Sequence, residues 1–129
     1  MEPPTKVTAS DETRRCVAWL AHEGARHGAN ASDIVVAGHS AGAHLAAMML
    51  CCEWPEVDKR LPIQMVRDGL GISGVYDLKP IQQTPFLQGD LRLTPEAVDR
   101  LSPARFRAPR EARFYAAVGA DESEEFLRQ

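Results

Sequence analysis

The feature that most restricts the fold of this chain is the segment 34–50, which reads IVVAGHSAGAHLAAMML. It begins with Ile34 to Ala37, four apolar and mostly β-branched residues, as expected for a strand buried on both faces of a parallel sheet. After two glycines that flank a serine, a second stretch from Ala43 to about Cys52 is apolar nearly all round, as a buried helix is. The segment therefore predicts a central strand, a tight turn and a buried helix.

Strands and helices are expected to alternate in the rest of the chain as well. A helix is predicted from Ser10 to Gly28, with Ser10 as its N-cap and Gly28 as its C-terminal stop. The other expected elements are a buried strand within 69–78, little regular structure over 79–93, a short helix opened by Thr94 and Pro95, a strand over 113–118, and a helix beginning at Glu124. This order is typical of an α/β protein with a parallel sheet, here predicted as one domain over residues 1–129.

The composition favours a small-molecule ligand. With 44% hydrophobic and 26% charged residues the chain should bury a core, and its net charge of −3 offers no basic face to nucleic acid or to an anionic membrane. The N-terminus has no apolar segment, and no run approaches the ~18 apolar residues of a membrane span, so a cytoplasmic protein is expected. The three cysteines lack C-x-x-C spacing, which supports neither disulfides nor zinc, and no metal or cofactor is expected.

Residues 38–42, G-H-S-A-G, have the spacing of a nucleophile elbow between a strand and a helix. Such a turn holds a serine hydroxyl out above the sheet, and it is tight enough to favour glycine at Gly38 and Gly42. It also places the backbone N–H of Ala41 at a helix N-terminus, where it can stabilise an oxyanion. Ser40 is therefore the candidate nucleophile, and the alternative is that Ser40 only caps the helix.

A serine nucleophile needs a base, normally a histidine oriented by a carboxylate, and in this class of fold the histidine comes last along the chain. After Ser40 the remaining histidine is His44, one helical turn away, where a packing or hydrogen-bonding role is favoured. His39 should point to the other side of the turn, and His22 and His27 belong to the first predicted helix. The catalytic base is therefore expected to lie outside this chain.

The acid of the site is predicted from a spacing after the last expected strand. A strand followed by G-x-x-[D/E] presents a carboxylate at the carboxyl edge of the sheet, and counting from Gly119 selects Glu122. Asp121 is the second choice, and Asp77, after the middle strand, is a third. The alternative is that the acids within 121–125 only form a solvated helix start.

Four motifs together resemble the arylformamidase (kynurenine formamidase) branch of the α/β-hydrolases. They are GHSAGAHLA from Gly38, SGVYDL from Ser73, LSP from Leu101 and ESEEFLRQ from Glu122, and the similarity runs from about Thr8 to the last residue. The resemblance implies hydrolysis of a small ester or formamide, such as an N-formyl aromatic amide, through an acyl-enzyme on Ser40 with the acid at Glu122. It also places Tyr76 near the rim of the site, where it either faces substrate or is an ordinary core tyrosine.

The chain also departs from that family in two places. Family members carry several strands and an H-G-G loop before the first helix, and a last strand and helix with the catalytic histidine after the acid, whereas this sequence contains no H-G-G. It resembles a middle piece of the domain, a partial α/β-hydrolase fold, with an open sheet edge through which it could pair with itself. Alternatives to an arylformamidase-like enzyme are a general carboxylesterase and a non-catalytic remnant that acts as a binding module; the isolated chain is expected to have at most trace activity.

Overall fold

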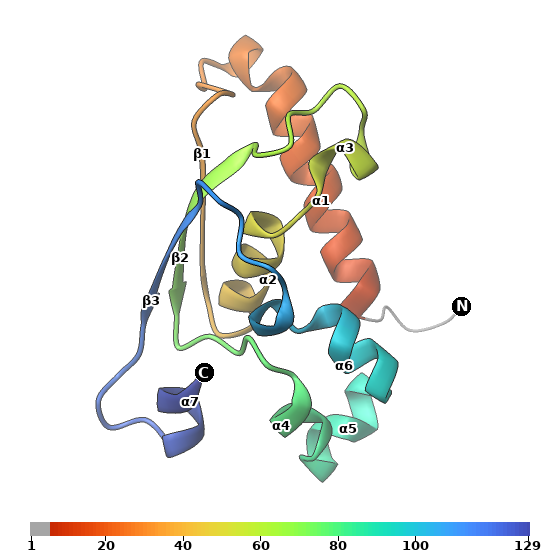
Figure 1. Cartoon of the computed structure of the whole chain (residues 1–129), viewed down its shortest axis with the longest axis vertical. Coiled ribbons are helices and arrows are strands. Elements are labelled where there is room, and N and C mark those ends of the chain that lie inside the picture. The colour runs from red at the N-terminus through yellow and green to blue at the C-terminus, as the bar shows by residue number, and fades with distance from the viewer. Residues whose placement is uncertain (1–5) are drawn as a thin grey trace.

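The computed structural model describes residues 6–129 as an α/β fold built on one parallel sheet (Figure 1). The sheet has three strands in the order β1 (Ile34–His39), β2 (Val66–Ile72) and β3 (Arg113–Ala117), and both neighbouring pairs are parallel. The helices are α1 (Lys6–Glu23), α2 (Ala41–Leu50), α3 (Trp54–Val57), α4 (Lys79–Gln82), α5 (Pro85–Leu91), α6 (Pro95–Leu101) and α7 (Glu124–Arg128), with short 3-10 turns η1 (Gly24–His27) and η2 (Pro103–Arg105). The predicted class of fold, with helices between parallel strands, is confirmed.

The helices α2 and α1 form two layers on one side of the sheet (Figure 1). The helix α2 packs on β1 and β2, and α1 packs on α2. As predicted from its composition, α2 is buried along most of its length, from Ala43 to Leu50. The hydrophobic core also includes Trp54, Val66 and Leu78, each at most 1% exposed.

The other face of the sheet is open in the described structure. Alternate residues of the three strands point to it, and Val35 in β1 is 61% exposed and Tyr115 in β3 is 56% exposed. The expectation that β1 is buried on both faces is therefore wrong for residues 6–129, because α2 covers only one face. β1 and β3 are also the two edges of the described sheet, so neither edge strand has a second partner there.

Two further predictions of local structure need correction. Ser10 is not an N-cap, because α1 already begins at Lys6 and Ser10 lies within the helix, 1% exposed. The stretch 79–93 contains α4 and α5, since Pro80 and Pro85 sit in the first helical turn, where a missing N–H costs nothing. By contrast Thr94 caps α6 as predicted, its side chain accepting a hydrogen bond from the N–H of Ala97 at 3.1 Å.

The described residues also bear on the classes of ligand considered above. Cys16, Cys51 and Cys52 are free thiols, and Cys16 is exposed. Within residues 6–129, no group of three or more His, Cys, Asp or Glu side chains is arranged to hold a metal ion. Over the same residues, no helix has the length and apolar character required to cross a bilayer.

Candidate active site

Ser40 occupies the turn between β1 and α2 in a strained backbone conformation. Its φ is 55° and its ψ is −113°, a region that residues with a side chain rarely adopt and that costs about 1–3 kcal/mol. Its side chain makes no capping hydrogen bond to α2. The helix-cap alternative is therefore not what the structure contains, and the hydroxyl of Ser40 is not engaged in holding the helix.

The two flanking glycines differ in what requires them. A Cβ atom on Gly38 would lie 2.2 Å from the backbone carbon and oxygen of Gly42, so Gly38 allows the close crossing of the strand end and the first turn of α2. A Cβ on Gly42 would meet nothing within 4 Å in the described structure. The prediction that both positions need glycine is thus met at Gly38, whereas packing within residues 6–129 gives no reason for glycine at Gly42.

Ala41 is the first residue of α2, so its N–H belongs to the first turn, which has no partner within the helix. Ser40 closes that turn through its carbonyl, which accepts a hydrogen bond from the N–H of His44 at 3.2 Å. The N-terminus of a ten-residue helix carries partial positive charge and favours an anion. The predicted oxyanion donor therefore lies in the expected element, directly after the candidate nucleophile.

Glu122 lies at the same edge of the sheet, in the turn after β3. Its Oε1 accepts hydrogen bonds from the hydroxyl of Ser73, at the end of β2, and from the N–H of Gly119 at 3.1 Å. These two donors, together with an electrostatic interaction with His39 at the end of β1, lower the pKa of the Glu122 carboxyl below its usual range. An ionised carboxylate at this place is what the acid of a catalytic triad requires.

The other two candidate acids have different surroundings. Asp121 is exposed, one residue before the anchored carboxylate. Asp77 is engaged in ion pairs with Arg105 at 3.1 Å and with Arg128 at 3.8 Å, and it also accepts a hydrogen bond from the N–H of Lys79. Of the three, Glu122 is the one that the structure joins to the strand ends beside Ser40.

Three of the four histidines make contacts that fit structural roles. His44 is buried, and its Nε2 lies 2.7 Å from the carbonyl oxygen of Leu101, so the hydrogen-bonding role predicted for it is confirmed. His22 lies 3.0 Å from Asp58, and the ring of His27 lies 5.5 Å from that of Trp19. His39 is exposed at the end of β1.

Tyr76 lies in the core beneath the strand ends. It is 8% exposed, its ring meets that of Phe114 edge to face at 5.4 Å, and its hydroxyl has no hydrogen-bond partner among residues 6–129. A Cβ on Gly71 or Gly74 would come within 2.2 Å of this hydroxyl, so the two glycines leave the space that the ring fills. Tyr76 therefore packs against Phe114 and also lines a surface hollow of about 400 Å³, and these contacts fit both alternatives.

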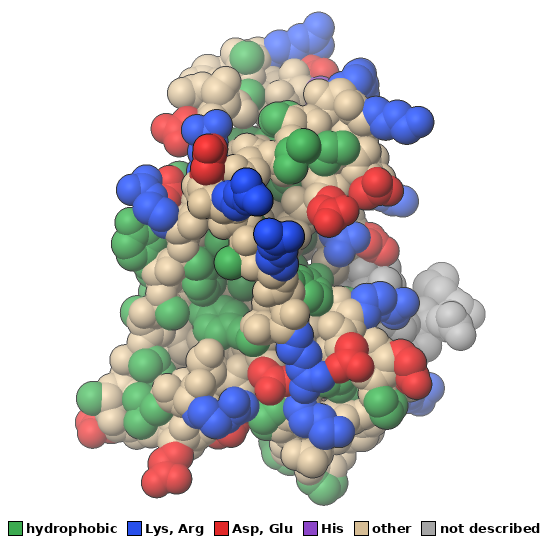
Figure 2. Space-filling model, in the orientation of Figure 1, with side chains coloured by type: hydrophobic (Ala, Val, Ile, Leu, Met, Phe, Trp, Pro, Cys, Tyr) green, Lys and Arg blue, Asp and Glu red, His purple; other side chains and the backbone are tan. Residues whose placement is uncertain are grey.

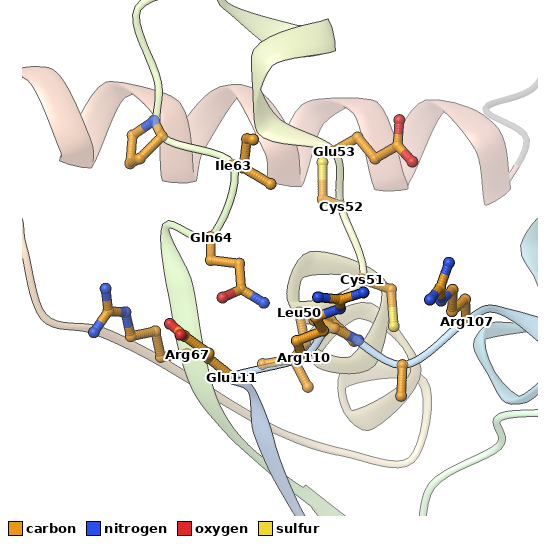
Figure 3. A pocket seen from close by; sticks show the side chains of 13 residues that line it. Leu50, Cys51, Cys52, Glu53, Ile63, Gln64, Arg67, Arg107, Arg110 and Glu111 are labelled. Atoms are coloured by element: carbon orange, nitrogen blue, oxygen red, sulfur yellow. The ribbon is translucent and has the colours of Figure 1, made fainter.

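Two hollows in the surface lie away from Ser40. One, of about 400 Å³, is lined mainly by apolar side chains such as Phe106 and Phe114, and Figure 2 shows it beside β3. The other, of about 600 Å³, lies at the opposite end of α2 from Ser40 and is lined by residues that include three arginines and two glutamates, Arg67, Arg107, Arg110, Glu53 and Glu111 (Figure 3). Neither hollow is lined by Ser40 or Glu122, so neither is assigned as an acyl pocket.

Sequence reasoning did not identify Ser73 as part of this site. Its hydrogen bond to Glu122 spans 49 residues of sequence, and a serine after a strand is too common to suggest such a contact. The contact depends on how the strands pair in the sheet, which the sequence around Ser73 does not reveal. Ser73 follows β2 at the position where Ser40 follows β1, and His39 is in register with Ile72.

The parallel sheet, the strained serine between β1 and α2, and the carboxylate after β3 are features of an α/β-hydrolase, and the comparisons with known proteins agree. The family model described as BD-FAE matches residues 5–106, and the chain belongs to this family. Kynurenine formamidases from Danio rerio and Salmo salar are 36% and 33% identical to it over 103 residues, in each case 76% of this chain and 34% of the relative. The chain therefore spans about a third of the length of these curated relatives.

A solved structure extends the likeness to nearly the whole chain. The crystal structure of a candidate thioesterase from Silicibacter sp. TM1040 matches with a TM-score of 0.76 and 28% sequence identity. The match covers 97% of this chain and 44% of that one. The chain thus corresponds to a part of the α/β-hydrolase fold, in the branch that contains the arylformamidases.

Proposed function

We propose that this chain carries the nucleophile and the acid of a serine hydrolase that cleaves a small ester or formamide bond. The observation that carries the proposal is Ser40, whose φ of 55° and ψ of −113° turn its side chain away from a capping role at the start of α2. A strained residue of this kind persists only where the surrounding structure fixes it, and such residues cluster at active sites.

The proposed reaction proceeds through an acyl-enzyme. The Oγ of Ser40 attacks the carbonyl carbon of the substrate while a base takes its proton, and the N–H of Ala41 donates to the oxyanion that forms. Collapse of this intermediate expels the alcohol or amine, which takes the proton from the protonated base. Water then attacks the acyl group by the reverse sequence and restores the hydroxyl of Ser40.

The proposal assigns the acid to Glu122 and includes a base from outside residues 1–129. Both the nucleophile and the acid require that base, because the base takes the serine proton and the carboxylate of a triad orients and stabilises the protonated imidazole. Hydrogen bonds from Ser73 and Gly119 hold Glu122 at the carboxyl ends of the strands, the end of the sheet where Ser40 also lies. The Nε2–H of His44 donates to the backbone carbonyl of Leu101 instead, and His22 is paired with Asp58.

The substrate class rests on the relatives. The two curated relatives named here are kynurenine formamidases, which supports a formamide or aryl amide substrate over a general carboxylic ester. The thioesterase assignment of the solved structure involves the same attack on a carbonyl carbon. A small acyl group is therefore proposed, with an arylformamidase-like specificity first and a general carboxylesterase second.

One observation favours a second candidate function, a binding module that associates through the sheet. Leu70, Ile72 and Tyr115 are 38%, 44% and 56% exposed on the face that α2 does not cover, and large exposed apolar patches mark interaction surfaces. A second copy or another partner could cover this face or extend the edge at β1. If the chain is only a binding module, adding a base should not make Ser40 react with an ester.

Chemical rescue of the missing base tests the proposal. The purified chain and its Ser40→Ala variant are given p-nitrophenyl acetate in buffers of rising imidazole concentration, so that free imidazole can act as the base. The proposal predicts a hydrolysis rate above that of Ser40→Ala, with the difference growing as imidazole is added. Equal rates in a folded wild-type chain and the variant, at every imidazole concentration, would rule out Ser40 as an activatable nucleophile.

A further inference from the structure

We infer that Ser73 is a positioning residue that fixes the carboxylate of Glu122 through its hydroxyl, and this inference rests on the proposed role of Glu122 as the acid. Ser73 directly follows β2 and is 8% exposed. Its Oγ donates a hydrogen bond to Oε1 of Glu122. A buried hydroxyl at the end of the neighbouring strand β2 is thus bonded to the carboxylate of Glu122.

The backbone of Ser73 indicates that the hydroxyl has a role at this position. Its φ is 47°, a conformation in which glycine is free of strain and serine is not. The N–H of Ser73 donates to the carbonyl of Ala117 at 2.7 Å, which ties the turn to the end of β3. Glycine would fit this backbone conformation better than serine. A role for the hydrogen bond from the Ser73 hydroxyl to the Glu122 carboxylate explains why a serine stands here.

The two oxygens of the carboxylate are used differently. Oε1 accepts from both the hydroxyl of Ser73 and the N–H of Gly119, while no hydrogen bond to Oε2 is present among residues 6–129. Two donors on one oxygen fix the plane and direction of the group. Oε2 of Glu122 is then the oxygen available to the N–H of a catalytic imidazole.

Residues 73–77 also contact the C-terminal end of residues 122–129, the segment that bears Glu122. The side chain of Gln129 accepts hydrogen bonds from the N–H groups of Tyr76 and Asp77, both at 2.8 Å. Arg128 adds an ion pair with Asp77 at 3.8 Å. Residues 73–77 therefore contact the acid-bearing segment at both of its ends, through Ser73 at Glu122 and through the backbone at Gln129.

The test is the titration of the Glu122 carboxyl, followed by carbon-13 NMR in the 129-residue chain. In Ser73→Ala the pKa of Glu122 is expected to rise toward its ordinary value, because the charged form loses a donor. Ser73→Gly removes the same hydroxyl but relieves the backbone strain, so it should be the more stable variant and should show the same rise. The matched control is Ser123→Ala, which removes an exposed hydroxyl of the same turn that makes no capping hydrogen bond.

The outcomes separate a positioning role from a merely structural one. A rise in the pKa of Glu122 in both Ser73 variants, with none in Ser123→Ala, supports the inference. An unchanged pKa in folded Ser73→Gly, or a rise in Ser73→Ala alone, would overturn it. The measurement needs no turnover, so a positive result combined with failed imidazole rescue would locate the fault in the proposed function and leave the contact between Ser73 and Glu122 intact.

Discussion

Ser40 and Ser73 end two neighbouring parallel strands in the same way. Both have positive φ, 55° and 47°, and the N–H of each donates to the carbonyl of the last residue of the next strand, Ile72 at 2.9 Å and Ala117 at 2.7 Å. Neighbouring strands lie about 4.8 Å apart, so the two serines and the turn that bears Glu122 meet at one edge of the sheet. This repeated strand end places the candidate nucleophile, after β1, and the candidate acid, after β3, at the same end of the sheet.

Gly38 and Gly42 should respond in opposite ways to the addition of a methyl group. Gly38→Ala drives a Cβ into the backbone of Gly42 at 2.2 Å and should cost more than about 3 kcal/mol of unfolding free energy. Gly42→Ala adds a helix-favouring residue in open space and should stabilise the chain by up to about 1 kcal/mol. Urea unfolding of the pair measures both values, and a well-tolerated Gly38→Ala would show that the strand and helix do not cross as described.

The strain at Ser40 predicts a difference in stability between two variants that lack its hydroxyl. Ser40→Ala keeps the unfavourable backbone, whereas Ser40→Gly relieves it at the cost of a more flexible unfolded chain. Ser40→Gly should therefore be about 1 kcal/mol more stable than Ser40→Ala in thermal or urea unfolding. If the alanine variant is equally stable or more stable, the backbone at Ser40 is not strained in solution.

The sequence predicts those parts of the site that depend on residues close together along the chain. The strand, turn and helix of 34–50 and the spacing from Gly119 to Glu122 follow from neighbouring residues, and short-range chemistry places Thr94 at a helix cap. The contact of Ser73 with Glu122 comes from the order of the strands, which no local pattern encodes.

The errors have equally specific causes. Ser10 has the side chain of an N-cap but lies inside α1, because the helical segment continues past it to Lys6. Val35 is apolar, yet it lies on the face that α2 does not cover, and a run of apolar residues does not reveal which of its two faces is covered. A run of apolar residues shows which side chains can be buried, whereas the helices that pack on the strand determine which of them are buried.

Tyr76 offers a test of whether its hydroxyl has a partner. Because that hydroxyl is buried without a hydrogen bond, Tyr76→Phe should leave stability unchanged or raise it by up to about 1 kcal/mol. Tyr76→Leu loses the edge-to-face contact with Phe114 and should be clearly destabilising. A loss of more than about 1 kcal/mol in Tyr76→Phe, measured by urea unfolding, would mean that the hydroxyl is bonded in solution.

Acidification should remove the stabilising effect of Glu122. Its pKa is lowered in the folded chain by Ser73, Gly119 and His39, so the ionised carboxylate stabilises the fold above the ordinary carboxyl pKa. That contribution is lost as the pH falls through the lowered pKa. The difference in urea midpoint between wild type and Glu122→Gln should be largest near neutral pH and should vanish in acid, with the exposed Glu124→Gln as control; a difference that is constant with pH would contradict the lowered pKa.

The most direct test of the central claim is to map the residue that reacts with a fluorophosphonate probe. The purified chain is treated with the probe in imidazole buffer, digested, and analysed by mass spectrometry beside Ser40→Ala and Ser73→Ala. We expect a single adduct on Ser40 that is absent from Ser40→Ala. An adduct on Ser73 or another serine, or no adduct on a folded wild-type chain, would contradict the assignment of Ser40 as the nucleophile.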